Sequence, residues 1–87
     1  MKADRDTVVR LVKTARGQMD GVLKMVEDDR YCVDIATQLM AVQSVLRKAE
    51  REILKAHMAS CVKDALLSDN AEEKMEELLG LIDQVTR

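Results

Sequence analysis

The sequence predicts an all-α protein, on two features of its composition and one pattern. The 87 residues include no Pro and only three Gly, so few positions interrupt a helix. Aromatic residues make up only 1% of the chain, which leaves Leu, Val, Ile, Ala and Met to form a core. Apolar residues recur at alternating spacings of four and three, the period of one helical face. We therefore predict one helical domain, 1–87, with three helices in the order short, long, short.

The first helix is expected at about 6–28, where Asp6 or Thr7 can cap its N-terminus. Its predicted apolar stripe is Val8, Val12, Ala15, Met19, Val22 and Val26. The polar segment 27–30 breaks this stripe, and we interpret it as a turn.

The second helix is expected at about 32–63, a stretch without Gly or Pro. Its predicted stripe is Ile35, Leu39, Val42, Leu46, Ala49, Ile53 and Ala56. The only two cysteines, Cys32 and Cys61, lie at the two ends of this segment, and the only histidine, His57, lies near the second end.

The third helix is expected at about 70–86, with Asp69 or Asn70 as its cap. Its predicted stripe is Ala71, Met75, Leu78, Ile82 and Val85. A chain this short buries a modest core by itself, and small helical proteins often complete theirs by oligomerising. Two long helices laid antiparallel, each with its own first helix, form a four-helix-bundle dimer.

Antiparallel pairing has a consequence for the cysteines. Along one helix Cys32 and Cys61 lie roughly 40 Å apart, so they cannot meet within it. In an antiparallel dimer, Cys32 of one chain lies beside His57 and Cys61 of the other. Two thiolates and an imidazole suit Cu(I), or Zn(II) with a fourth ligand, and the lack of an obvious fourth ligand favours Cu(I). The alternative is that both cysteines are small core residues and His57 is a surface residue.

Basic residues gather on two helices although the formal net charge is −2. They suggest a phosphate-contacting surface of an oligomer, since no zinc finger, basic zipper or helix-turn-helix motif is present. The alternative is an ordinary solvated helix face. The candidate DNA-binding residues are Arg10, Lys13, Arg16, Arg47, Lys48 and Arg51.

Other classes of function find little support in the sequence. There is no Gly-rich phosphate loop, no Ser/His/Asp set and no carboxylate–histidine metal helix, so we do not expect an enzyme. There is no secretory signal, no apolar run long enough to cross a membrane and no lipidation motif, so we expect a cytoplasmic protein with no membrane partner.

The segment RLVKTARGQMDGVLKMVEDDRYCVDIATQLMAVQSVLRKAEREILKAHMASCV, residues 10–62, resembles the copper-sensitive operon repressor family of bacteria. The resemblance implies an antiparallel dimer that pairs into a tetramer. It also implies Cu(I) bound by Cys32 of one chain and by His57 and Cys61 of the other, with Tyr31 and Glu77 as neighbours of the ligands. In such proteins the apo form binds its operator, and Cu(I) releases the DNA so that copper-efflux genes are expressed.

Branches of this family differ at the ligand positions. The nickel and cobalt sensors have an extra N-terminal His and a His in place of Cys61, and the formaldehyde sensors have a Pro after the initiator Met; none of these features is found here. The persulfide sensors keep both cysteines but typically lack the His, so a reactive-sulfur sensor that uses Cys32 and the neighbouring chain's Cys61 is the alternative. A metal-buffering or scaffold bundle with no role on DNA is the third hypothesis.

Overall fold

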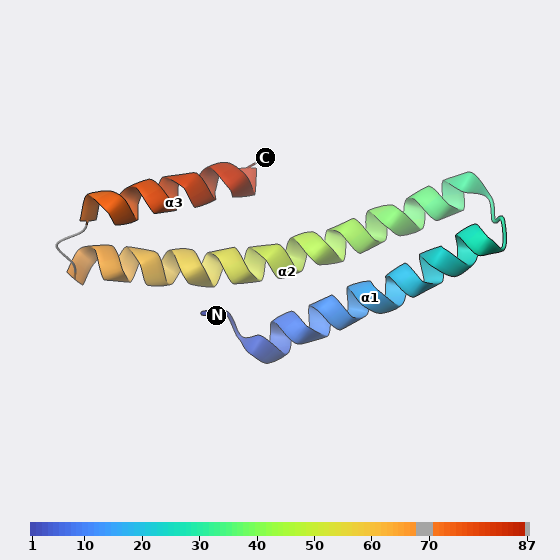
Figure 1. Cartoon of the computed structure of the whole chain (residues 1–87), viewed down its shortest axis with the longest axis horizontal. Helices are drawn as coiled ribbons and strands as arrows, with labels where there is room; N and C mark the ends of the chain where they lie inside the picture. The colour runs from blue at the N-terminus through green and yellow to red at the C-terminus, as the bar shows by residue number, and fades with distance from the viewer. Residues whose placement is uncertain (68–70, 87) are drawn as a thin grey trace. The chain divides into compact units, whose positions relative to one another are not determined.

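A computed structural model describes residues 1–67 and 71–86 of the chain. Over these residues it has three helices and no strand: α1 (Arg5–Glu27), α2 (Cys32–Leu67) and α3 (Ala71–Thr86) (Figure 1). The predicted all-α fold is confirmed. Helix α2 runs 36 residues and ends four residues beyond the predicted end at 63. The predicted caps Asp69 and Asn70 lie outside the described residues. In the part of the chain that is described, no helix combines the length and apolarity needed to cross a membrane.

The chain forms two compact units. The first unit is Arg5–Glu50, which contains α1 and the first part of α2. The second unit is Met1–Asp4 together with Arg51–Arg87, which contains the rest of α2 and all of α3.

In the first unit, α1 folds back along the first part of α2 (Figure 1). Three buried residues, Ala15 and Val22 of α1 and Val42 of α2, form its core cluster, and Ile35 and Val45 pack against them. Small and β-branched side chains let two helix surfaces interlock closely, and fully burying a Val side chain such as Val22 or Val42 contributes roughly 1.5–3 kcal/mol.

The predicted stripe of α1 is only half correct. The residues buried against the rest of the chain are Val8, Leu11, Ala15 and Val22. The other predicted members, Val12, Met19 and Val26, are 48%, 45% and 53% exposed. Helix α1 thus carries two adjacent lines of apolar residues. The line through Leu11, which also includes Val8, Ala15 and Val22, packs against the rest of the chain, and the line through Val12, Met19 and Val26 is exposed.

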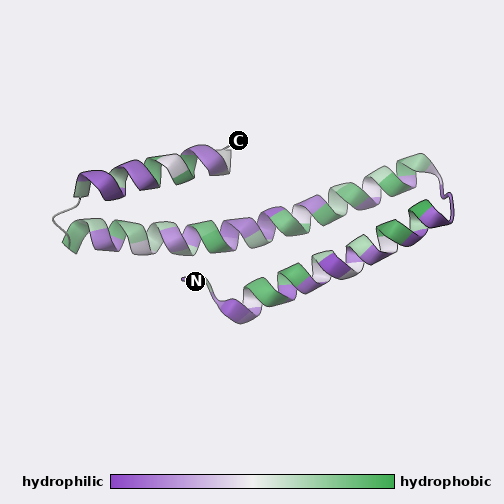
Figure 2. Ribbon diagram, viewed as in Figure 1, coloured by the Kyte–Doolittle hydropathy of each residue, from purple (hydrophilic) through white to green (hydrophobic). Residues whose placement is uncertain are grey.

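On α2 and α3, too, only part of the predicted apolar stripe is buried. On α2, Val42 and Ala49 are buried, whereas their predicted companions Leu39 and Leu46 are 37% and 48% exposed. On α3, Met75 and Ile82 are 49% and 40% exposed, and Leu78 is half-buried. Figure 2 shows that hydrophobic residues recur along all three helices among hydrophilic ones.

The predicted turn at 27–30 is confirmed, and its geometry is a Schellman motif. The Arg30 N–H donates to the Met25 carbonyl at 2.9 Å, and the Asp29 N–H donates to the Val26 carbonyl at 3.1 Å. Asp29 has a φ of 55°, the left-handed conformation that this motif requires. The motif satisfies two terminal carbonyls of α1 and turns the chain back toward α2.

In the second unit, α3 runs beside the last part of α2 (Figure 1). Its half-buried side chains are Lys74, Leu78 and Leu81, on one face of the helix. On α2, Cys61 is the buried residue of this unit, with 5% of its surface exposed. This pairing brings α3 next to the part of α2 that carries His57 and Cys61.

Candidate functional site

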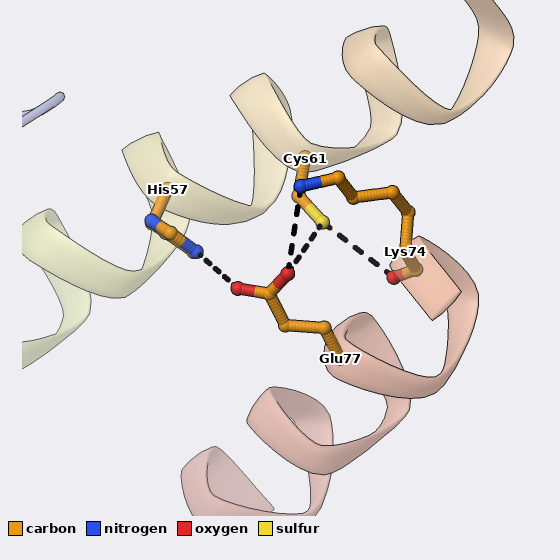
Figure 3. Close-up of polar contacts among 4 residues, drawn as sticks. All are labelled: His57, Cys61, Lys74 and Glu77. Carbon is orange, nitrogen blue, oxygen red and sulfur yellow. Dashed lines mark hydrogen bonds and ion pairs between the residues drawn. The ribbon is translucent and has the colours of Figure 1, made fainter. Parts of the chain in front are cut away.

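His57 and Cys61 lie one turn apart on α2, and both contact the carboxylate of Glu77 on α3 (Figure 3). The His57 Nε2 atom lies 3.0 Å from Glu77 Oε1, and the Cys61 Sγ atom lies 3.8 Å from Glu77 Oε2. An ionised carboxylate only accepts hydrogen bonds, so Nε2 carries the proton of the His57 ring. One acidic side chain of α3 therefore holds an imidazole and a thiol of α2 together.

Cys61 has two acceptors for its single thiol proton. Besides Glu77, the main-chain carbonyl oxygen of Lys74 lies 3.5 Å from the Cys61 Sγ atom. Burial raises the pKa of the Cys61 thiol, and the negative charge of Glu77 raises it further. The site thus holds Cys61 as a neutral thiol that donates to α3.

Glu77 is held in its ionised form. The hydrogen bond from His57 is the main cause that lowers the pKa of its carboxyl group. The Lys74 ammonium, one turn earlier on α3, lies 4.0 Å from Glu77 Oε2 and contributes in the same direction. The His57 and Glu77 side chains are each 46% exposed, so solvent screens this ion pair.

Sequence reasoning names three of the four residues in this cluster and misses Lys74. Its main-chain acceptor has no signature in the sequence, because every residue carries a carbonyl. Its ammonium leaves a weak signal, an i, i+3 pairing with Glu77 that is common on helices.

The other predicted site residues, Cys32 and Tyr31, lie in the first unit. Cys32 is the first residue of α2 and is an exposed free thiol. Tyr31 is 66% exposed, and its carbonyl accepts the Ile35 N–H at 3.2 Å, which starts the helix. Among residues 1–67 and 71–86 of one chain, no three His, Cys, Asp or Glu side chains form a group that could hold a metal ion.

The six candidate DNA-binding residues are all exposed. Those on α1 are Arg10, Lys13 and Arg16, and those on α2 are Arg47, Lys48 and Arg51. Two short polar side chains accompany them: Thr14 donates to the Arg10 carbonyl at 2.9 Å, and Ser44 accepts from Arg47 Nη2 at 3.5 Å. An exposed set of long cations is what contact with a phosphate backbone requires.

The donor atoms at the second unit fit a soft or borderline metal ion. Because His57 Nε2 is engaged with Glu77, the neutral ring presents the lone pair of Nδ1. Cys61 adds a sulfur donor once its proton is lost. One nitrogen and one sulfur make an incomplete coordination sphere, so a site built here needs at least one further donor.

Comparison with known proteins assigns the family. The sequence profile of the metal-sensitive transcriptional repressor family matches residues 4–84. The copper-sensing transcriptional repressor CsoR of Bacillus subtilis (strain 168) is 37% identical over 84 residues, which cover 97% of this chain and 83% of that protein.

Two solved structures have the same fold. The Cu(I)-bound copper-sensing repressor CsoR of Geobacillus thermodenitrificans superposes with a TM-score of 0.81 at 36% identity, covering 94% of this chain and 85% of that one. The nickel-responsive transcriptional regulator InrS superposes with a TM-score of 0.85 at 28% identity, covering 98% and 96%. Both are metal-responsive regulators, in agreement with the profile. This chain belongs to the family of metal-sensitive transcriptional repressors.

Proposed function

We propose that this repressor responds to Cu(I), and that its metal site is completed between two chains. Cys32 of one chain and His57 and Cys61 of the other are the proposed ligands, in an antiparallel dimer that pairs into a tetramer. The observation that carries the proposal is the convergence of His57 and Cys61 on Glu77, which presents one nitrogen and one sulfur donor side by side. The copper-sensing relatives support the choice of ion.

His57 and Cys61 would hold Cu(I), an ion that prefers thiolate and imidazole ligands. As a ligand Cys61 would be a thiolate, which has no proton to donate to the Lys74 carbonyl or to Glu77 Oε2, so its contacts with α3 would change. Glu77 would orient the His57 ring through the hydrogen bond to Nε2.

As a transcriptional repressor the protein acts on DNA, and we propose that the six exposed basic residues contact the operator backbone. An oligomer repeats each basic set, which compensates for a chain whose net charge is −2. The change at α3 is the proposed link between the metal site and this surface. A repressor works where its operator lies, so we place this activity in the cytoplasm.

The alternative is a sensor of reactive sulfur that uses Cys32 and the neighbouring chain's Cys61, and the surroundings of Cys61 do not favour that residue as the attacking thiol. The thiolate is the form that attacks sulfane sulfur. Burial and Glu77 raise the pKa of Cys61, which keeps it protonated. A metal ion, by contrast, can displace this proton on binding.

The test is a titration of the reduced apo-protein with Cu(I) against a competing chelator, followed by binding to the promoter DNA of its own gene. We expect tight Cu(I) binding that His57→Ala weakens by at least about tenfold, the usual scale for loss of a ligand or its support. Glu52→Ala, an exposed change on α2, is the control. Equal Cu(I) affinity of wild type and His57→Ala, or DNA binding that does not fall with Cu(I), contradicts the proposal.

A further inference from the structure

Lys74 contacts the candidate metal site through two different atoms. Its main-chain carbonyl oxygen lies 3.5 Å from Cys61 Sγ, and its ammonium lies 4.0 Å from Glu77 Oε2. Glu77 Oε2 is also the oxygen that lies 3.8 Å from Cys61 Sγ. Lys74 is half-buried, so its side chain lies along the surface of α2 and α3 (Figure 3).

The two oxygens of Glu77 have different partners. Oε1 is held by His57 at 3.0 Å. Oε2 has two longer contacts, with the Cys61 thiol and the Lys74 ammonium. A carboxylate rotates about its terminal bond at little cost, so a cation at Oε2 fixes which way the group faces.

We propose that Lys74 is a positioning residue of the candidate metal site. Its ammonium holds the Glu77 carboxylate in the orientation in which this group contacts both His57 and Cys61. The inference rests on the proposed function, in which His57 and Cys61 are metal ligands. Lys74 does not touch the metal in this account and acts only through Glu77.

The experiment compares wild type with Lys74→Met, Lys74→Arg, Glu77→Gln and the charge control Lys63→Met, an exposed change on α2. His57 is the only histidine, so the imidazole ¹⁵N resonances of the full-length apo-protein belong to one residue. In Lys74→Met we expect these resonances to move toward their positions in Glu77→Gln. Lys74→Arg should restore them, and Lys63→Met should leave them unchanged.

Cu(I) affinity, measured by chelator competition, is the second readout. An exposed ion pair contributes up to about a fivefold change in an equilibrium, so we expect Lys74→Met to bind Cu(I) about two- to fivefold more weakly. The difference should shrink at high salt because its origin is Coulombic, and Lys74→Arg should remove it.

Unchanged His57 resonances in Lys74→Met overturn the proposal, and so does a failure of Lys74→Arg to restore them. If wild type does not bind Cu(I), the proposed function fails instead. The apo-protein resonances still decide whether Lys74 positions Glu77, so the two failures are distinguishable.

Discussion

Glu77 links α3 to α2, since its carboxylate accepts from both His57 and Cys61. The same arrangement makes Cys61 a poor nucleophile, for burial and the Glu77 charge both raise its pKa.

Glu77→Gln should make Cys61 more reactive, because it removes one of the two main causes that raise the thiol pKa. We expect a faster second-order rate of alkylation by iodoacetamide in a Cys32→Ser background, where Cys61 is the only thiol. Burial, the larger cause, remains, so the rate should stay below that of an unstructured thiol. Glu76→Gln, an exposed neighbour on α3, is the control, and an equal rise in both variants would contradict the account.

The stability that Glu77 contributes should depend on pH in one direction. Its pKa is lowered in the folded protein, mainly by the hydrogen bond from His57, so the unfolded chain takes up the proton first in acid. The contribution is present above the ordinary pKa of a glutamate and is lost as the pH falls through the lowered value. Urea unfolding of wild type and Glu77→Gln should therefore differ near neutral pH and converge in acid, and a difference that grows in acid would refute the assignment.

At the scale of elements, the Schellman motif between α1 and α2 sets the direction in which the chain turns back. Its left-handed position is occupied by Asp29, at a φ of 55°. Aspartate tolerates this conformation better than most residues, but glycine adopts it without steric cost.

Asp29→Gly should therefore stabilise the protein, by about 0.5–1 kcal/mol. Urea or thermal unfolding measures the gain. Asp28→Gly is the matched control, because Asp28 has no positive φ and glycine there only adds freedom to the unfolded chain. Loss of stability in Asp29→Gly would show that the Asp29 side chain matters more than its backbone conformation.

The period of apolar residues predicts three helices, but it cannot decide which of two adjacent apolar lines packs within the chain. On α1 the line through Leu11 is buried and the line through Val12 and Met19 is exposed, although both have helical spacing. The i, i+4 spacing of His57 and Cys61 predicts their proximity, and only the family resemblance indicated Glu77. The main-chain contact of Lys74 depends on the packing of α3, which no local pattern encodes.

At the scale of the whole molecule, the proposed metal site needs a donor from a second chain, because His57 and Cys61 supply only one nitrogen and one sulfur. The apolar lines that stay exposed on α1 and α2 give a second copy a surface to bury. In the antiparallel dimer that we propose, Cys32 of one chain lies beside His57 and Cys61 of the other.

Arg47→Ala should weaken DNA binding, because the shortened side chain can no longer reach and neutralise a phosphate. We expect the affinity to fall similarly for operator and unrelated duplexes, and the slope of log affinity against log salt to become less steep by about one unit for each phosphate left without its cation. Fluorescence anisotropy at several salt concentrations measures both. Lys24→Ala is the control, because Lys24 is a basic residue of α1 outside the proposed set. An unchanged slope in Arg47→Ala would show that Arg47 does not contact the DNA.

The shared metal site is tested most directly by mixing two inactive variants, Cys32→Ser and Cys61→Ser. Alone, each lacks a ligand in every site. After the subunits exchange at random, half of the dimers are mixed and each holds one complete site, so Cu(I) binding should return to about one quarter of the wild-type sites in a dimer of twofold symmetry. A mixture that binds no more Cu(I) than its components, or a single variant that binds like wild type, would contradict a site made by two chains.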